Sequence, residues 1–300
     1  MTQSGPWRLG LLGEAPDSFW DALRRELAAN GFVEGTDFVV NMGRAGGNYD
    51  LLPMVAQKLV RESPDVIVAS GNSATRAVKA ATSTIPIVMI VGADPVEEGL
   101  IASLARPGGN VTGIASLSQR LTPKRLELLQ ELLPGITEIA VLVNASSASS
   151  PAAIRDLQDA ARDYRLHLRV HGVATPDDIA AAIAAIAAER SRAIMIVPSQ
   201  LLFHERSRIA TLARQFRLPT ISGDRDLVEA GGLASYAPNF SDMYRDAAKY
   251  VLRIRKGARA VDMPVEQPTR FELVVNMQTA KTIGVEIPPT VLARADEVIE

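Results

Sequence analysis

The chain has 300 residues, of which 47% are hydrophobic and 22% are charged, a composition typical of folded globular proteins. Its net charge of −2 and the lack of any long basic run argue against nucleic acid and anionic membrane surfaces as main partners. The chain has no cysteine, which excludes thiol nucleophiles, cysteine-ligated zinc and disulfide bonds. At roughly 100–200 residues per domain, the length predicts two domains.

Membrane and export signals are absent from the sequence pattern. The longest apolar run, residues 179–188, is far shorter than the ~20 residues of a membrane span, so no direct membrane insertion is expected. Residues 1–12 lack the charged, apolar and cleavage-site regions of a signal peptide. We therefore expect either a cytosolic protein or a mature exported form that restarts with Met. The lack of cysteine suits both compartments.

Strand-like and helix-like segments alternate along the chain. Several strand-like runs are apolar without alternation, as in parallel strands that helices cover on both faces. Between them, apolar residues recur at helical spacing, as at Phe19, Leu23 and Leu27. This alternation indicates an open α/β fold. In chain order, the expected strands are residues 8–12, 37–42, 65–70, 86–91, 138–144, 166–172 and 192–198, with a crossing strand at 110–118, a long helix at 240–258 and a short strand within 263–276.

Two stretches of the chain, residues 46–75 and 173–203, repeat one order of features. Each has a polar start, a helix, a strand and a polar end. Each would be the second strand–helix step of its own sheet, so the repeat predicts two similar lobes instead of one large sheet.

The loops that follow the strands are the places to look for ligand contacts, because open α/β sheets bind ligands beyond the carboxyl ends of their strands. These positions are rich in Gly, Ser, Asn and Asp and poor in pairs of catalytic side chains, which favours binding over catalysis. They comprise Gly13, Glu14, Asp17, Ser18, Ser70–Thr75, Asp94 within 91–95, Thr112, Gly113, Ser116, Asn144 with 145–151, Ser199 within 198–200, and Asp224 within 222–224.

The junction of Ser70, Gly71, Asn72 and Ser73 follows an apolar strand and opens a helix that is expected to start near Ser73. The first backbone N–H groups of a helix have no intrahelical acceptor and carry partial positive charge. Gly71 permits close approach of the backbone, while Asn72 and Ser73 add side-chain hydrogen bonds. The junction therefore predicts a seat for a carboxylate or phosphate. Ordinary N-capping is the alternative, since Asn and Ser are preferred caps in any protein.

Other chemistries have little support in the sequence. The nucleotide-binding patterns GxGxxG and GxxxxGK[ST] are absent, and no HExxH occurs, so no cofactor and no metal are expected. Solvated or capping roles are favoured for the histidines, with His167 and His171 at one strand and His204 in a helix. Asp94 precedes Pro95, and it would either start a helix or accept a ligand ammonium.

Residues 85–118, IPIVMIVGADPVEEGLIASLARPGGNVTGIASLS, closely resemble the ABC-transporter substrate-binding proteins of the tryptophan/tyrosine-type family. That family shares the type I periplasmic-binding-protein fold. The block DPV…GL…SLARPGGNVTG is specific to this group, and the match spans essentially the whole chain. Further matching stretches are residues 31–40, 49–60, 123–144, 218–239 and 264–300.

The resemblance implies two Rossmann-like α/β lobes with parallel sheets, joined by a three-segment hinge and closing on a ligand in a cleft between them. Lobe 1 would comprise residues 1–116 plus 237–263, and lobe 2 residues 117–236 plus 264–300. The hinges would lie near residues 115–118, 235–238 and 262–266.

The resemblance also implies where the ligand is held. Its carboxylate would meet the helix N-terminus at Asn72, Ser73, Ala74 and Thr75, the region that the residues themselves predict as an anion seat. The remaining ligand-binding positions would be Glu14, Ser18, Ser70, Gly71, Asp94, Ser116, Asn144, Ser199, Asp224 and Tyr236.

Three departures from the family pattern fall among these positions. Relatives often have Gly-Thr-Pro where this chain has Gly71-Asn72-Ser73, Tyr-Gly-Ser where it has Ser222-Gly223-Asp224, and Ser where it has Ala115. The family's specificity for aromatic amino acids is therefore not carried over. Asp224 adds a charge that would bind a ligand ammonium or reject a second carboxylate.

Together these observations predict a non-catalytic receptor of an ABC importer that binds a small carboxylate, such as an amino acid, and has an ABC permease as its partner. Its expected location is periplasmic or otherwise extracytoplasmic, with the cytoplasm left open. Two alternatives remain. One is a cytosolic ligand-sensing domain of the same fold, and the other is a two-lobed Rossmann-like enzyme with Glu14 and Asp224 as its catalytic pair.

Overall fold

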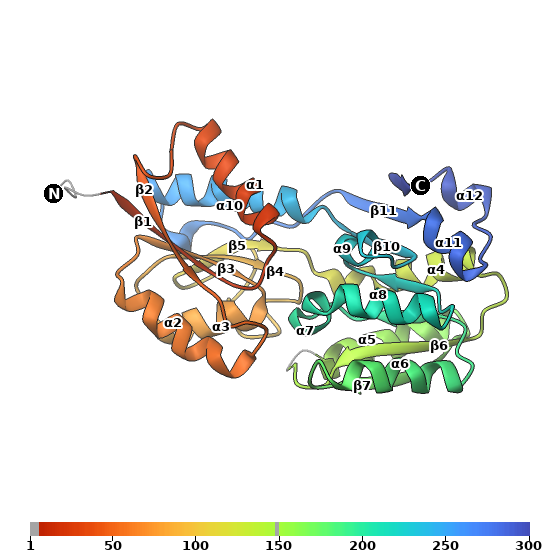
Figure 1. Cartoon of the computed structure of the whole chain (residues 1–300). Coiled ribbons are helices and arrows are strands. Elements are labelled where there is room, and N and C mark those ends of the chain that lie inside the picture. Colours follow the sequence, from red (N-terminus) through yellow and green to blue (C-terminus); the bar gives the residue numbers. More distant parts are fainter. Residues whose placement is uncertain (1–5, 148–149) are drawn as a thin grey trace. The chain divides into compact units, whose positions relative to one another are not determined.

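The computed structural model describes residues 6–147 and 150–300. Residues 1–5 and 148–149 lie outside the described residues. The first range is part of the segment that we searched for a signal peptide, and the second is part of the polar stretch after Asn144. Figure 1 shows the chain with its helices and strands labelled. Among the described residues, no helix combines the length and apolarity that crossing a membrane requires.

The chain divides into two compact units. Unit 1 comprises Met1–Leu117 and Pro238–Thr269, and unit 2 comprises Ser118–Ala237 and Arg270–Glu300. The chain therefore passes between the units three times.

The third passage follows Thr269, later than the boundary at residue 263 that the sequence analysis expects. Two backbone hydrogen bonds hold the intervening segment in unit 1. The Val265 N–H donates to Leu104 O at 2.7 Å, and the Glu266 N–H donates to Gly113 O at 3.0 Å.

Unit 1 is built on a five-stranded sheet in the order β2-β1-β3-β4-β5, and all of its strand pairs are parallel. Helices α1 and α10 cover one face of this sheet, and α2 and α3 cover the other, as Figure 1 shows. The elements are β1 (Trp7–Leu12), α1 (Asp17–Ala29), β2 (Phe38–Gly43), η1 (Tyr49–Leu51), α2 (Leu52–Arg61), β3 (Val66–Ser70), α3 (Asn72–Ala81), β4 (Ile87–Val91), β5 (Val111–Ala115), α10 (Phe240–Arg255) and η3 (Ala260–Asp262).

Strand β3 shows why the sequence selects a sheet covered on both faces. Val66 and Val68 pack into the cluster beneath α1 and α10, while Ile67 and Ala69 pack into the cluster beneath α2 and α3. Successive side chains of a strand point to opposite faces, so an unbroken apolar run is buried on both sides.

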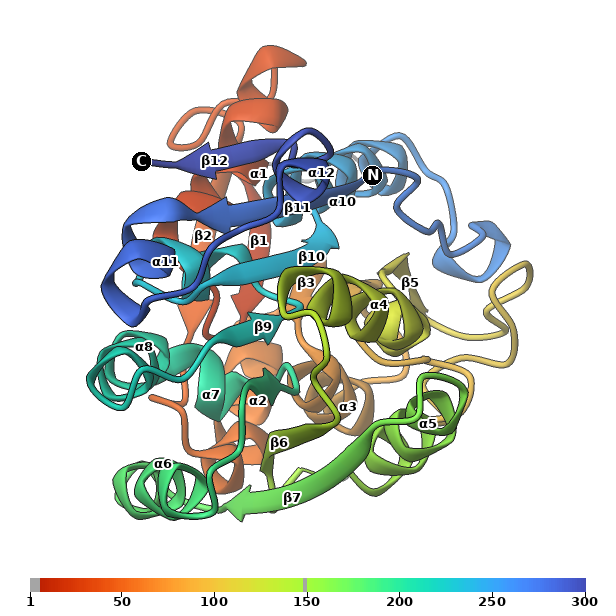
Figure 2. The same cartoon turned by 90° about the vertical axis from the view of Figure 1, so that its right-hand side faces the viewer.

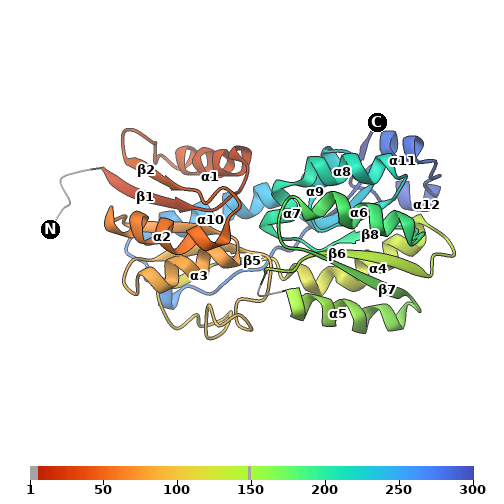
Figure 3. The same ribbon diagram turned by 60° about the horizontal axis from the view of Figure 1, so that its bottom comes forward.

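Unit 2 contains a seven-stranded sheet in the order β12-β11-β10-β9-β8-β6-β7. Figures 2 and 3 show this sheet with α4 and α5 on one face and α6 and α8 on the other. The elements are η2 (Ser118–Leu121), α4 (Thr122–Leu132), β6 (Glu138–Asn144), α5 (Ser150–Asp163), β7 (His167–Val173), α6 (Asp178–Ala188), β8 (Ile194–Ile196), α7 (Gln200–His204), α8 (Arg206–Gln215), β9 (Thr220–Ser222), α9 (Arg225–Glu229), β10 (Ala234–Pro238), β11 (Phe271–Asn276), α11 (Met277–Ile283), α12 (Pro289–Leu292) and β12 (Glu297–Ile299).

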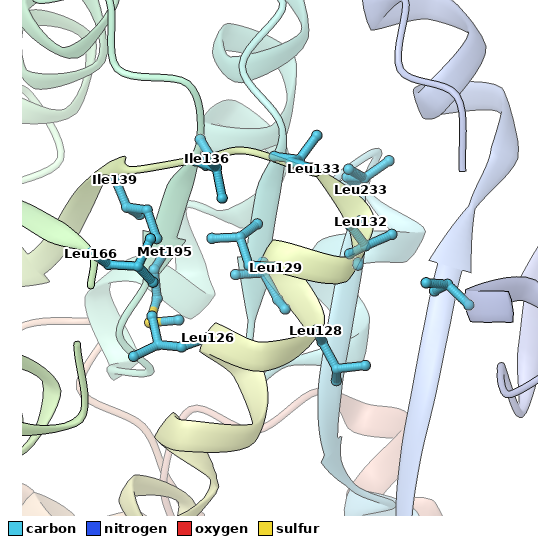
Figure 4. Packing of buried hydrophobic residues seen from close by; sticks show 14 of the residues in the cluster. Leu126, Leu128, Leu129, Leu132, Leu133, Ile136, Ile139, Leu166, Met195 and Leu233 are labelled. Carbon is cyan, nitrogen blue, oxygen red and sulfur yellow. The ribbon is translucent and has the colours of Figure 1, made fainter. Parts of the chain in front are cut away.

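The larger core of unit 2 forms where α4 packs on the sheet. Leu126 and Leu129 of α4 are fully buried and belong to one cluster with Ile139 of β6 and Met195 of β8, as Figure 4 shows. Burial of side chains of this size is the main stabilising contribution in such a core.

The two sheets share one pattern of strand order. In chain order, the first five strands of each are arranged second, first, third, fourth and fifth: β2-β1-β3-β4-β5 and β7-β6-β8-β9-β10. The repeated stretches 46–75 and 173–203 contain α2–β3 and α6–β8, which occupy equivalent places in the two sheets. The interpretation of the repeat as two similar sheets is confirmed.

Most of the expected elements are confirmed with small shifts at their ends. The strand expected at 192–198 is shorter, and only Ile194–Ile196 pair with their neighbours. The helix expected at 240–258 ends at Arg255. The expected strands do not include β9, β10 or β12 of the second sheet.

Candidate functional site

The junction between β3 and α3 lies at the carboxyl end of the middle strand of unit 1. Gly71 has φ +94° and ψ 153°, a conformation that glycine adopts without the steric penalty of a side chain. Gly71 N donates to Ile90 O at 2.8 Å, so the loop is fixed to β4. The helix begins at Asn72, one residue earlier than expected, and Gly71 provides no side-chain cap.

The first turn of α3 leaves backbone donors available. Thr75 is fully buried, and both its N–H and its Oγ1 donate to Gly71 O, at 3.0 and 2.9 Å. In contrast, no residue in the described ranges accepts a hydrogen bond from the N–H groups of Asn72, Ser73 and Ala74. These three donors stand at the positive end of the helix dipole, which is the arrangement that binds anions at helix N-termini.

The Asn72 side chain connects α3 to the loop after β4. Its Oδ1 accepts hydrogen bonds from Gly92 N and Ala93 N, both at 3.2 Å. Its Nδ2 is buried and has no partner at hydrogen-bond distance among the described residues. Burial raises the pKa of the nearby Glu98 carboxyl, and Arg76 opposes this rise. The Asn72 oxygen thus holds two strand ends together, a role that differs from the expected ligand contact.

Ser116 follows β5 and carries an unpartnered buried hydroxyl. The residue is 4% exposed, and its N–H donates to Val91 O at 2.9 Å. Its Oγ has no hydrogen-bond partner among the described residues. A Cβ built on Gly92 would lie 4.0 Å from this Oγ, so the hydroxyl lies beside the loop that Asn72 holds. A buried hydroxyl without a partner is costly, and a ligand group that hydrogen-bonds to it would remove that cost.

An aromatic cluster that the sequence analysis did not identify adjoins the same junction. Ser70 Oγ hydrogen-bonds to the hydroxyl of Tyr244 in α10. The Tyr244 ring lies 5.3 Å from that of Phe19 in α1, and Phe19 stacks on Phe240 at 5.9 Å. Phe19 and Phe240 are half-buried. An apolar surface therefore begins next to the polar α3 junction.

Two of the other expected positions of unit 1, Glu14 and Asp94, have structural partners. Glu14 Oε1 accepts hydrogen bonds from the N–H groups of Ala45 and Gly46, the latter at 2.9 Å. Asp94 Oδ1 accepts from Val96 N at 2.9 Å, and a turn follows in place of the helix that one interpretation of Asp94 predicted. Ser18 is an exposed residue in the first turn of α1.

Two of the four expected positions of unit 2, Ser199 and Asp224, serve as helix caps. Asn144 is buried, and its Oδ1 accepts from Ser146 N at 2.9 Å, while its Nδ2 has no partner among the described residues. Ser199 Oγ caps α7 by accepting from Leu202 N at 3.3 Å. Tyr236 lies within β10, and its ring packs against the core of unit 2.

Asp224 is the N-cap of α9, and its Oδ1 accepts from Asp226 N at 3.0 Å. Burial and the neighbouring Asp226 carboxylate raise the pKa of Asp224 well above its usual value, while Arg206 acts in the opposite direction. Asp224 therefore serves as a helix cap, and Glu14 accepts hydrogen bonds from a loop. The structure also places them in different units.

Arg125 in α4 is a second residue that the sequence analysis did not identify. It is 3% exposed, and its guanidinium donates to Tyr236 O, Ser118 O and Ser118 Oγ at 2.8–2.9 Å. The described residues contain no cluster of His, Cys, Asp and Glu that could hold a metal ion.

The matches of this chain to known proteins extend over most of its length. A family model described as ABC transporter substrate binding protein matches residues 12–299. A tyrosine-binding protein of Clostridioides difficile (strain R20291) is 26% identical over 263 residues, covering 87% of this chain and 75% of that protein.

Two solved structures are similar over their full length. A conserved domain protein from Vibrio cholerae is 29% identical with a TM-score of 0.92, and the match covers 99% of this chain and 100% of that one. The ABC domain from Streptococcus pneumoniae in complex with L-Trp is 23% identical with a TM-score of 0.91, covering 98% and 100%. The expected fold class, an α/β fold with two sheets of mostly parallel strands like the type I periplasmic-binding-protein neighbours, is confirmed.

Proposed function

Because the chain belongs to the family of ABC transporter substrate binding proteins, we propose that it is the receptor that binds a small carboxylate-bearing solute and delivers it to an ABC permease. The observation that carries this proposal is the α3 junction of unit 1. Three backbone N–H groups, of Asn72, Ser73 and Ala74, are left without acceptors there. Helix N-termini of this kind bind carboxylates and phosphates.

The ligand carboxylate takes the place of the missing acceptors. One oxygen accepts from the first-turn N–H groups, while Ser116 Oγ, which is buried and unpartnered, supplies a further hydrogen bond from the end of β5, on the far side of β4 from β3. Hydrogen bonds to a charged group contribute about 1.5–3 kcal/mol each. Thr75 takes no part, because Gly71 O already accepts both of its donors.

The ligand is an α-amino acid with an apolar or aromatic side chain. The curated relative is a tyrosine-binding protein, and a similar solved structure is a complex with L-Trp. In this chain, Phe19 and Phe240 form a half-buried aromatic pair that reaches Ser70 through Tyr244. A flat apolar side chain packs favourably against such rings.

The two units close on the ligand, and the protein performs no turnover. Chain passages between compact units absorb such closure motions in two-domain receptors. The side chains of Glu14 and Asp224 accept backbone hydrogen bonds at a loop and at a helix start, which supports a structural role for each of them. An extracytoplasmic location follows from the role of a receptor that feeds an ABC importer.

A ligand screen tests the proposal. Thermal shift and then calorimetry are run against the amino acids, simple organic acids, sugars and nucleotides, with small-angle scattering before and after saturation. We expect an amino acid to raise the melting temperature and to make the protein more compact. A sugar or nucleotide that raises it, while no carboxylate does, would overturn the proposal. Chemical turnover of a bound solute that is lost on Glu14→Gln would favour the enzyme instead.

A further inference from the structure

Arg125 is a buried cation in unit 2 and is not part of the proposed carboxylate site at Asn72, Ser73 and Ala74 of unit 1. Its side chain reaches from the first turns of α4 to two backbone segments of unit 2. Nε donates to Tyr236 O at 2.9 Å, Nη1 to Ser118 O at 2.9 Å and Nη2 to Ser118 Oγ at 2.8 Å. No carboxylate in residues 6–147 and 150–300 pairs with it, and burial lowers the pKa of Arg125 to about 10.

The surroundings of the guanidinium are shaped to admit it. Gly223 follows β9, and a Cβ built there would lie 2.8 Å from Arg125 Cζ, which is closer than real contacts allow. A Cβ at the same place would lie 2.9 Å from Cγ of Pro198. Glycine at this position therefore makes room for the guanidinium at the carboxyl end of β9.

The two segments that Arg125 joins belong to two of the three passages between the units, where the chain first enters unit 2 and where it leaves it. Ser118 is the first residue of unit 2, and Tyr236 stands one residue before Ala237, where the chain returns to unit 1. A planar guanidinium with several fixed donors can hold two such segments at once, which a lysine ammonium cannot do with the same geometry.

The backbone next to this contact has an unusual conformation. Leu117 is 3% exposed and has φ +47°, a region that residues with a Cβ seldom adopt. The other non-glycine residues with positive φ in the described ranges, Ser63, Arg165, Arg190 and Arg217, each follow a helix. Leu117 instead follows a strand and directly precedes Ser118, so the passage between the units is held in a strained turn beside Arg125.

We propose that Arg125 is the positioning residue of ligand binding, because it fixes the directions in which the chain passes between the units at Leu117–Ser118 and Tyr236–Ala237. It does not touch the ligand. It sets the balance between the ligand-free and the ligand-bound conformations, and the apparent affinity follows from that balance. This inference rests on the proposed function, since it assigns a residue to the conformational step of the same receptor.

Spin-label distances test the inference directly. The chain has no cysteine, so Gln57→Cys on α2 and Gln158→Cys on α5, both exposed, give one labelled pair. The distance distribution is measured without ligand and with saturating L-tyrosine or L-tryptophan, in the otherwise unchanged protein, in Arg125→Lys and in Ser118→Ala. Ser118→Ala removes one acceptor and serves if Arg125→Lys does not fold. Arg294→Lys is the matched control, because Arg294 makes an exposed ion pair with Glu131 of the same helix α4.

We expect Arg125→Lys to shift or broaden the ligand-free distribution and to weaken binding about 3- to 10-fold, a change within the reach of a population shift. Ser118→Ala should do the same to a smaller extent, and Arg294→Lys should do neither. A ligand-free distribution and affinity that match the unchanged protein, even with a lower melting temperature, would overturn the inference. If neither amino acid binds the unchanged protein, the proposed ligand class fails, while the ligand-free distances still decide the role of Arg125.

Discussion

The β3–α3 junction of unit 1 and the β8–α7 junction of unit 2 occupy equivalent places in sheets of the same strand order. In unit 1 the helix starts after Gly71, which has no side chain to offer, and three N–H groups are left open. In unit 2 the helix starts after Ser199, whose Oγ accepts from Leu202 N. The N-cap side chain therefore makes the difference for one first-turn donor: Ser199 satisfies the Leu202 N–H in unit 2, and Gly71 has no side chain to do the same in unit 1.

The fifth strands of the two sheets extend the comparison. β5 has Gly113 at its third position, where β10 has Tyr236. Gly113 has φ +131°, and a Cβ built on it would lie 2.6 Å from Met89 N of β4. Unit 1 thus depends on close backbone contact at the strand that leads to Ser116, whereas unit 2 fills the equivalent position with a ring.

The largest effect is expected for Gly113→Ala. The added methyl group clashes with the β4 backbone and also strains the left-handed conformation, so we expect a loss of about 3 kcal/mol or more in the free energy of unfolding. Gly109→Ala is the control, because nothing lies within 4 Å of a Cβ there, and we expect less than about 0.5 kcal/mol. Urea denaturation measures the free energy of unfolding of both variants. Equal midpoints for Gly113→Ala and Gly109→Ala would contradict the dependence of unit 1 on close backbone contact at β5, the feature that distinguishes β5 from β10.

Ser116→Ala is expected to have a smaller effect, with stability unchanged or raised and ligand binding weakened. The hydroxyl has no protein partner, so its removal should leave the melting temperature unchanged or raise it. Affinity for the amino-acid ligand should fall about 3- to 10-fold.

Thr112→Val on the same strand is the matched control for Ser116→Ala. Thr112 Oγ1 donates to Met263 O at 2.7 Å, so this variant should lose about 1–2 kcal/mol of stability and keep its affinity. Calorimetry and thermal melts separate the two patterns. A Ser116→Ala protein that is destabilised with unchanged affinity would show that the hydroxyl is structural.

The smallest effect concerns pH and Asp224 in unit 2. Burial and the neighbouring Asp226 raise the pKa of Asp224 in the folded state, and Arg206 opposes this rise. Glu229 in turn raises the pKa of Asp226. An acidic group whose pKa is raised on folding contributes less to stability as the pH rises. For Asp224 this loss begins near its ordinary pKa of 3.8 and continues until the pH passes the pKa of the folded state.

Asp224→Asn keeps an N-cap acceptor and removes the charge. Its melting temperature relative to the unchanged protein should therefore rise between pH 4.5 and pH 8. Thermal melts across this range measure the difference between the two proteins. A difference that stays constant or falls with pH would contradict the raised pKa.

The fold could be predicted from the sequence because its signals are local. The run Val66–Ala69 is apolar throughout, and only a strand covered on both faces buries all of it. Strand β12 could not be found in this way, because Glu297–Ile299 is short and half-buried, with no apolar pattern of its own. Its pairing with β11 depends on the rest of unit 2.

The site was only partly predictable, since much of it depends on contacts between distant residues. The Gly71 junction has a local signal, and its position was predicted within one residue. Arg125 has none: it follows Lys124 in a helix, where two basic residues normally face water, and only the tertiary fold buries it. The contact of Asn72 with Gly92 and Ala93, across 20 residues, is equally invisible in the sequence.

Comparing one ligand in two forms tests the central claim most directly. The amino acid that raises the melting temperature most is titrated in parallel with its carboxamide into the unchanged protein and into Ser73→Asp. Ser73 is the second residue of α3, where an aspartate suits the helix N-terminus but repels a bound carboxylate. Thr290→Asp, at the second position of α12, is the matched control.

We expect Ser73→Asp to weaken binding of the amino acid about 10- to 100-fold and to leave binding of the carboxamide almost unchanged. Thr290→Asp should affect neither ligand. Equal losses for the amino acid and its carboxamide, or no loss for the amino acid, would contradict a carboxylate seat at the start of α3.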